Sequence, residues 1–522
     1  MTGPFEIITF GILVIALLLS FLPKARFARA AFYASGLAFA GFVAVSTFGT
    51  PRGPLLPGAL LALILLAVTF FRLEYPMPNN WRRKTVFGAY MVLGSLLAAL
   101  AVILPLGFPV FDPPAPSGPH GVGYAHTILT DDSRTDIVTH SARELPVQVW
   151  YPASVPADAE PLPFIPDVEQ AGHLMGDNLG LPLEFFDYLG DIKGHSYDGA
   201  PVARAGGFPV LVFSHGFGSI GAQNVLLMEH LASHGYVVFS LEHPHQNAWV
   251  RLKGGKTASF KPEGFGFQEL TPEKTAELEA MIVRLVNAPD YESYANEVSA
   301  FMNEQSGFIS GLKLWLDDTD YLLDELQAET VGAFGPLYNH MDITRLGVFG
   351  MSYGGAAAGM LCLEDARCKA GINMDGLQFG EHNMRFAINR PFMLMNSDGN
   401  LFMEPANRKG PTRFKVNEFV YRQATGPMYS LTVANAKHMN YSDFAFLMPV
   451  AEKLGLFGPV SADAMNRIMN DYVQGFFDRY LKGVGTPVLD RTGKEDPAIL
   501  EFIHRNVDEG TFAAGQQLKE GE

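Results

Sequence analysis

A serine set between glycines is the feature of this sequence that most strongly indicates catalysis. Gly350, Ser352 and Gly354 fit the pattern G-x-S-x-G, which alone is a weak signal in a chain with 53 glycines. Its setting is stronger, because the apolar run LGVF leads into the motif and the small-residue run GGAAAGM follows it. A sharp strand-to-helix turn of this kind lifts a serine oxygen above the edge of a sheet. The sequence therefore predicts Ser352 as the nucleophile of an ester hydrolase.

A second glycine-containing loop is placed to stabilise the charge that develops when a serine attacks a carbonyl. The residues HGFG, His215 to Gly218, directly follow the apolar run FPVLVF. In hydrolases with such a serine turn, the loop after this strand supplies one of the backbone donors to the oxyanion. We expect the amides of Phe217 and Tyr353 to form the oxyanion hole. The other interpretation of HGFG is a tight turn with no catalytic role.

The base that removes the serine proton should be a histidine late in the chain, since these enzymes carry their triad in the order serine, acid, histidine. Of the 14 histidines, His438 follows the last predicted strand, in VANAKHMNYSDF. His243 and His245 follow the run YVVFS at the same edge of the expected sheet. They are candidates for the substrate pocket, as is His215, or else they are loop histidines.

The elements that would position these residues alternate between short apolar runs and helix patterns. Such alternation is typical of a mostly parallel sheet covered by helices on both faces, the α/β class. Two half-buried strands, 121–129 and 145–151, come first, and an amphipathic helix, 461–481, comes last. The expected buried strands are 208–213, 236–240, 346–349, 370–374, 391–395 and 429–433.

Residues 249–327 interrupt this alternation as an insertion. Its first part is polar, and it ends in the helix pattern SGLKLWLDDTDYLLDEL. An insertion at this point could close over a cleft as a lid, or it could be peripheral decoration. The hydrolase domain is therefore expected over 122–485, followed by a polar C-terminal tail, 486–522.

The first hundred residues have a different composition. Their four apolar runs are each about long enough to cross a bilayer core of roughly 30 Å as a helix. A cleaved signal peptide is disfavoured, because the basic residues follow the first run instead of preceding it. The runs contain almost no ionisable side chains, so an anchor is favoured over a transporter. We expect a membrane anchor over 1–106 with spans near Phe5–Leu22, Ala30–Phe48, Leu55–Phe71 and Thr85–Leu106.

The distribution of basic residues predicts how this anchor is oriented. Lys and Arg gather in the first and third connections between the apolar runs, and none occurs between Leu106 and Arg134. By the positive-inside rule, those two connections are cytoplasmic, which places the hydrolase domain outside the cytoplasm. Residues 107–121 are rich in proline and glycine and are expected to form a semi-rigid linker.

Charge argues against a nucleic-acid partner. The whole chain carries a formal net charge of −16, and the anchor contributes eight basic and two acidic side chains, so the remainder carries −22. An acidic domain of this kind repels phosphate. The expected partners are a lipid or small ester substrate and the membrane itself, and the oligomeric state is left open.

Several short motifs of the chain, taken together, resemble those of a known family. The segments VQVWYPA, FPVLVFSHGFGS, LASHGYVVFSLEH, GINMDG, NSDGN and HMNYSDF, with the serine turn, resemble the plasma-type platelet-activating factor acetylhydrolases and their bacterial relatives over most of residues 121–480. The resemblance implies an α/β-hydrolase fold and a calcium-independent serine esterase that favours short or oxidised acyl chains. It also implies that Asp375, in GINMDG, is the acid of the triad. Chain order alone also allows Asp398, which stands after the strand expected at 391–395. No cofactor is required.

The chain departs from the family at two positions near the expected pocket. Met351 stands where the family usually has histidine, and EHPH stands where it commonly has EHRD. Met351 is therefore a further candidate for the substrate pocket. The alternatives are a dienelactone-hydrolase-like, polyester or peptide hydrolase on the same fold, or a non-catalytic tethered binding domain.

The two cysteines, Cys362 and Cys368, lie six positions apart after the serine turn. An extracytoplasmic domain permits a disulfide between them, and free buried thiols remain the alternative. No zinc site is indicated.

Reporter fusions test the expected orientation. A reporter that is active only outside the cytoplasm should be active when fused after Leu106 and silent when fused between Arg72 and Lys84. The reverse pattern would place the hydrolase in the cytoplasm and remove the argument for a disulfide.

Overall fold

The computed structural model divides the chain into two compact units. Unit 1 comprises Met1–Pro113, Pro163–Gly194 and Phe446–Ala451, and unit 2 comprises Pro114–Leu162, His195–Ala445 and Glu452–Glu522. Within them, the structure describes residues 4–22, 24–48, 52–74, 81–204, 206–261, 272–304, 306–328, 334–380, 386–398, 413–490 and 496–507.

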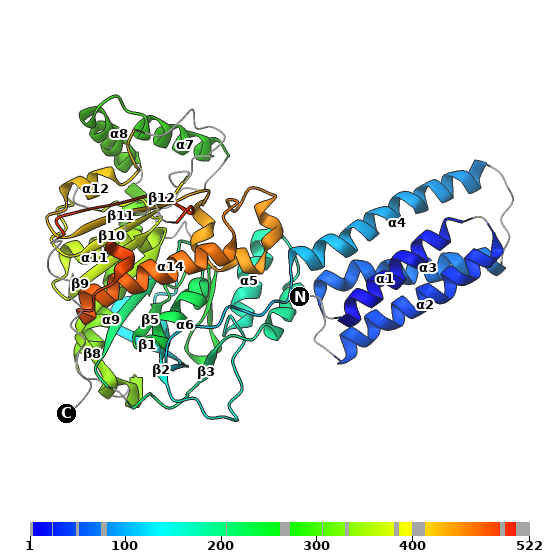
Figure 1. Ribbon diagram of the computed structural model, residues 1–522, viewed down its shortest axis with the longest axis horizontal. Coiled ribbons are helices and arrows are strands. Elements are labelled where there is room, and N and C mark those ends of the chain that lie inside the picture. Colours follow the sequence, from blue (N-terminus) through cyan, green and yellow to red (C-terminus); the bar gives the residue numbers. More distant parts are fainter. Residues whose placement is uncertain are drawn as a thin grey trace. The chain divides into compact units, whose positions relative to one another are not determined.

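Unit 1 contains four apolar helices, in the order expected from the sequence. They are α1 (Pro4–Ser20), α2 (Ala25–Phe48), α3 (Leu56–Glu74) and α4 (Trp81–Gly107), drawn in blue in Figure 1. Three segments, Arg26–Val45, Gly53–Glu74 and Gly88–Gly107, are long and apolar enough to cross a membrane, whereas the apolar part of α1, Ile8–Ser20, is shorter. The expectation of four spans is thus supported for three helices.

Unit 1 also includes a segment that the sequence assigned to the hydrolase domain. Helix α5 (Val168–Leu179) and the 3-10 helix η2 (Leu183–Asp191) belong to it. The reason is aromatic packing, since the ring of Phe108, just after α4, lies 5.5 Å from that of Phe185 and 6.0 Å from that of Phe186. Aromatic side chains bury large areas and favour such edge-on pairs. The compact units therefore do not follow the expected boundaries at 106 and 122.

Unit 2 is built on a ten-stranded sheet (Figure 1), in the order β12-β11-β10-β9-β8-β4-β5-β2-β1-β3. All pairings from β5 through β4, β8, β9 and β10 to β11 are parallel. The pairs β1–β2, β2–β5 and β11–β12 are antiparallel. The strands are β1 (Gly121–Thr135), β2 (Ala142–Ala153), β3 (Ser196–Asp198), β4 (Phe208–Ser214), β5 (Val237–Leu241), β8 (Met341–Met351), β9 (Cys368–Met374), β10 (Phe392–Ser397), β11 (Met428–Val433) and β12 (Ile499–Arg505).

Strand β12 corrects the expectation that residues 486–522 form only a polar tail. It pairs with β11 and closes one edge of the sheet. Its Phe502 is buried and stacks on Tyr429 of β11 with the ring centroids 5.9 Å apart. The strand is a short apolar run, ILEFI, inside a segment that is otherwise polar and charged, which is why the composition of 486–522 as a whole indicated a polar tail.

Helices cover both faces of the parallel strands, as expected for the α/β class. The elbow helix α11 (Tyr353–Glu364) packs with α9 (Ser306–Gln327), and α6 (Val225–Ser233) packs with α14 (Ala462–Phe477). Alternate residues of the central strands face the two layers. Val212 and Val348 join the core that includes α9 and α11, whereas Phe349 packs on Phe477 of α14 with the rings 5.7 Å apart.

The insertion consists of parts with different roles. It begins with a hairpin of β6 (Trp249–Arg251) and β7 (Thr257–Ser259), followed by the helix pair α7 (Pro272–Val286) and α8 (Tyr291–Glu304). Helix α9 then enters the main core, where Trp315 and Leu322 have no exposed surface. Helix α9 is therefore neither a lid nor decoration but one of the layers that covers the sheet.

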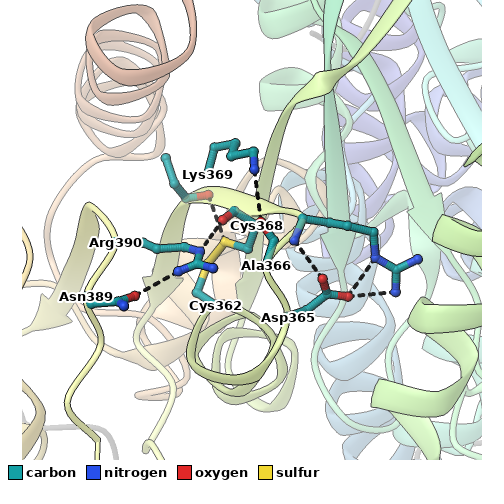
Figure 2. The surroundings of a disulfide bond; sticks show 9 residues. Cys362, Asp365, Ala366, Cys368, Lys369, Asn389 and Arg390 are labelled. Atoms are coloured by element: carbon teal, nitrogen blue, oxygen red, sulfur yellow. Dashed lines mark hydrogen bonds and ion pairs between the residues drawn. A yellow bond between two sulfur atoms is a disulfide. The ribbon is translucent and has the colours of Figure 1, made fainter.

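A disulfide closes the turn between α11 and β9. Cys362 and Cys368 are bonded, with Cα atoms 5.1 Å apart (Figure 2). Arg390 donates from Nε to the Cys368 carbonyl at 2.5 Å, and Asp365 accepts from the Arg367 amide at 2.7 Å. The exit of the elbow helix is thus fixed by a covalent link and by charged hydrogen bonds.

The close approach of the first turn of α11 to the end of β4 predicts that Gly354→Ala is strongly destabilising. A Cβ at Gly354 would lie 2.0 Å from the Ser214 carbonyl oxygen, so backbone would have to move. Overpacking of this kind costs about 1–3 kcal/mol or more. We expect a clearly lower thermal midpoint by scanning fluorimetry. Gly206→Ala is the control, because the nearest atom to its Cβ would be 3.9 Å away. Equal midpoints for the two variants would contradict the packing described.

Candidate active site

Ser352 occupies a strained turn between β8 and α11. Its φ of 58° and ψ of −117° lie outside the regions that non-glycine residues usually adopt. The turn persists because both neighbours hold it: the Ser352 amide donates to the Met374 carbonyl at 2.9 Å and the Gly354 amide donates to the His215 carbonyl at 3.1 Å. Strain of this kind occurs where the surrounding structure over-determines the backbone, and it is concentrated at functional sites.

The structure brings Ser352, His438 and Asp375 into one hydrogen-bonded chain. The Ser352 Oγ and the His438 Nε2 are 2.9 Å apart, and the His438 Nδ1 lies 2.7 Å from the Asp375 Oδ2. Asp375 is 5% exposed, and its other carboxylate oxygen accepts from the Ser397 amide at 2.6 Å. A buried carboxylate on Nδ1 leaves Nε2 free of the ring proton, so that it can accept the serine proton.

Asp398 stands after the next strand and is the other acid that chain order allows. Its Oδ2 accepts from the Asn435 amide at 3.0 Å, and its own amide donates to the Ala436 carbonyl at 3.0 Å. These bonds hold Asp398 against the loop that precedes His438. His438 contacts the carboxylate of Asp375 through Nδ1, at 2.7 Å.

The residues expected to form the oxyanion hole, Phe217 and Tyr353, lie in two segments that contact each other. Tyr353 is the first residue of α11, and the amides in the first turn of a helix point toward its N-terminal end, where Ser352 lies. The Phe217 ring lies 5.4 Å from the Tyr353 ring, so the two loops are in contact. The Tyr353 hydroxyl donates to the Phe308 carbonyl of α9 at 2.6 Å. This bond attaches the side chain of Tyr353 to α9.

The four residues expected to line the substrate pocket are instead enclosed. His215, Met351, His243 and His245 are each at most 3% exposed. Burial, with His243 nearby, lowers the pKa of His215 to about 3, so His215 is neutral. Its Nδ1 donates to the Gly216 carbonyl at 2.7 Å and its Nε2 accepts from the Asn247 amide group at 3.1 Å. In this structure the four side chains are packed inside the hydrolase unit.

A set of buried polar residues beside the site has no motif in the sequence that would identify it. Glu242 Oε1 accepts from the Gln148 side chain at 2.8 Å and from the Gly221 amide at 3.0 Å, which fixes the loop after β4. Asp318 and Arg143 form an ion pair with less than 2% of either side chain exposed. The one available signal was the spacing of Trp315 and Asp318, which places both on the same face of a helix.

No group of three or more His, Cys, Asp or Glu residues is arranged to hold a metal ion in the part of the chain that the structure describes. A hydrogen-bonded serine, histidine and aspartate can carry out acyl transfer through a covalent serine ester.

A parallel sheet with a serine at a strand-to-helix turn defines an α/β-hydrolase, and the comparisons with known proteins agree. The family model for platelet-activating factor acetylhydrolase, isoform II, matches residues 109–483. The chain belongs to this family, which confirms the resemblance, and it is a carboxylic ester hydrolase.

Individual relatives are similar over most of their length. The platelet-activating factor acetylhydrolase of Gallus gallus is 24% identical over 76% of this chain and 89% of its own. A probable 1-alkyl-2-acetylglycerophosphocholine esterase of Arthroderma benhamiae is 23% identical over 78% and 99%. Among solved structures, a ferulic acid esterase from Streptomyces cinnamoneus aligns with a TM-score of 0.54 and 25% identity, covering 75% of this chain and 99% of its own.

The contacts of the two acids predict unequal effects of their substitution. Asp375→Asn should lower kcat by up to ~10⁴, because the imidazole loses both its orientation and the partner of its cation. Asp398→Asn should change kcat far less. Hydrolysis of p-nitrophenyl acetate measures both variants, with circular dichroism to check folding. A large loss confined to Asp398→Asn would show that the acid is assigned wrongly.

Proposed function

We propose that the chain is a membrane-anchored serine esterase in which Ser352, His438 and Asp375 form the catalytic triad. The hydrogen-bonded chain from the serine oxygen to a buried carboxylate, with contacts of 2.9 and 2.7 Å, carries the proposal. A non-catalytic binding domain would have no need to keep the strained serine turn, the histidine and the acid together.

Hydrolysis proceeds in two steps. The Ser352 oxygen attacks the ester carbonyl while His438 takes its proton, and the amides of Phe217 and Tyr353 stabilise the oxyanion. His438 then gives the proton to the departing alcohol, which leaves an acyl group on Ser352. Water, deprotonated by His438, attacks this acyl-enzyme, and the acid is released as the serine regains its proton.

The proposed substrates are lipid or phospholipid acyl esters with short or oxidised chains. Family membership supports an acetylhydrolase or esterase of this type. The name of the Arthroderma relative specifies an acetyl ester of an alkyl glycerophosphocholine. An enzyme tethered to a bilayer meets such lipids at a high effective concentration.

Aromatic acid esters are the second candidate class. The solved relative is a ferulic acid esterase, and in this chain Phe217 lies among aromatic rings, 5.0 Å from Phe260 and 5.9 Å from Phe308. Aromatic surroundings favour stacking with an aromatic acyl group. Comparing kcat/KM for p-nitrophenyl esters of graded length, oxidised phospholipids and a feruloyl ester distinguishes the two classes.

The proposed location is the extracytoplasmic face of a membrane. Three helices with the length and hydropathy of membrane spans support the anchor. The excess of Lys and Arg in the connections at residues 24–29 and 72–84 supports the orientation.

Ser352→Ala tests the proposed nucleophile. The variant should fold normally, lose esterase activity and fail to react with a fluorophosphonate probe, because the attacking oxygen is removed. Activity is measured on p-nitrophenyl acetate, and labelling by gel fluorescence. Ser310→Ala is the control, because this exposed serine donates to the Gly307 carbonyl of its own helix, α9, and lies apart from the triad residues in the chain. Labelling retained by Ser352→Ala would rule out this serine.

A further inference from the structure

A buried carboxylate on the insertion helix accepts hydrogen bonds from three parts of the hydrolase unit. Asp318 of α9 has no exposed surface. It accepts from Arg143 of β2 through Nε at 3.0 Å and Nη2 at 2.8 Å, from Arg134 of β1 at 2.9 Å, and from His243 Nδ1 at 2.9 Å. These partners hold the pKa of Asp318 well below its usual range. The carboxylate is therefore charged and fully committed to fixed donors.

His243 connects this carboxylate to an indole ring. Its imidazole stacks on Trp315 with the ring centroids 3.9 Å apart and the planes 14° apart. Burial lowers the pKa of His243, so the ring is neutral and its one proton is on Nδ1, toward Asp318. The Trp315 indole N–H donates to the side-chain carbonyl of Gln246. Both the plane and the rotation of the indole are thus fixed.

The edge of the indole contacts both loops of the proposed oxyanion hole. Trp315 lies 4.8 Å from the Tyr353 ring and 4.9 Å from the His215 ring, in edge-on geometry. Tyr353 directly follows the serine, and His215 begins the loop that carries Phe217. A single buried ring therefore spans the two backbone segments whose amides must converge on one oxygen.

We infer that Asp318, His243 and Trp315 are positioning residues that set the distance between the two oxyanion-hole amides. The inference rests on the proposed function. Donors in such a site must be held to within about 0.5 Å of their productive positions. The Gly354 amide joins the two loops at one point, through the His215 carbonyl at 3.1 Å. The Trp315 ring supplies a second point, on the side of α9.

Removing the indole tests this inference through kcat and the binding of a transition-state mimic. In the full-length protein, Trp315→Leu should lower kcat on p-nitrophenyl acetate by about 10- to 100-fold with KM little changed. This is less than the ~10²–10³ typical of deleting a donor. The Ki of a trifluoromethyl ketone, which binds serine esterases as an oxyanion, should rise by a similar factor. Trp315→Phe, which keeps a ring between the loops, should restore most of both.

A matched variant separates positioning from loss of stability. Trp150 of β2 is as buried as Trp315, packs on Tyr124 at 5.3 Å and lies outside the described contacts of either loop. Trp150→Leu should lower the thermal midpoint comparably while leaving kcat and Ki near those of the wild type. Equal losses of kcat and Ki in both leucine variants would overturn the inference, as would wild-type values for Trp315→Leu.

If Trp315→Leu does not fold, His243→Leu provides the same test. It removes the ring under the indole and leaves Trp315 in place, and unchanged kcat and Ki for this variant would overturn the inference. Failure of the proposed function has a different signature, because it would appear as esterase activity and labelling that survive Ser352→Ala.

Discussion

The positive φ of Ser352 is the constraint on which the site depends. A non-glycine residue in such a conformation costs of order 1–3 kcal/mol, so it persists only where its neighbours hold it. Here the Met374 carbonyl holds the serine amide and the His215 carbonyl holds the amide of Gly354. The turn also needs glycine at position 350, since a Cβ there would lie 2.3 Å from the backbone of Gly354. The two hydrogen bonds tie the turn to the ends of the neighbouring strands, β4 and β9. The turn therefore fixes the positions of the HGFG loop, which follows β4, and of Asp375, which follows β9.

Most of the fold and part of the candidate site could be predicted from short stretches of the sequence. The parallel strands follow apolar runs bounded by turn residues, and Ser352 and His438 follow from a strand-to-helix motif and from chain order. Asp375 did not follow from local signals, because Asp398 also stands directly after a strand. Which acid meets His438 is decided by a contact across 63 positions of sequence. Only resemblance to a family could favour Asp375 in advance.

The features that could not be predicted from the sequence depend on packing between residues far apart in the chain. Helix α9 follows a polar segment, so it could be interpreted as a lid, yet Trp315 and Asp318 are fully buried. Asp318 meets Arg143, which lies 175 positions earlier, and no local pattern identifies that partner. The grouping of residues 163–194 with the N-terminal helices similarly depends on the ring of Phe108 meeting Phe185. Strand β12 is a short apolar run in a polar segment, and its pairing with β11 identifies it as part of the sheet.

The buried charges around Asp318 are better explained by geometry than by stability. Removing charges from water costs several kcal/mol per ion, and a buried ion pair commonly repays little more than that cost. What such a pair provides is a fixed orientation of one element relative to the other. Arg143 donates to Asp318 from Nε and Nη2, and to Asp136 from Nη1 at 2.6 Å. Because these bonds have fixed directions, they fit one register of α9 against β2. Apolar side chains of similar volume would hold the helix comparably but would tolerate small shifts along its axis. A shift of α9 would move Trp315 against both Tyr353 and His215, so a directional anchor suits a helix that supports the oxyanion hole.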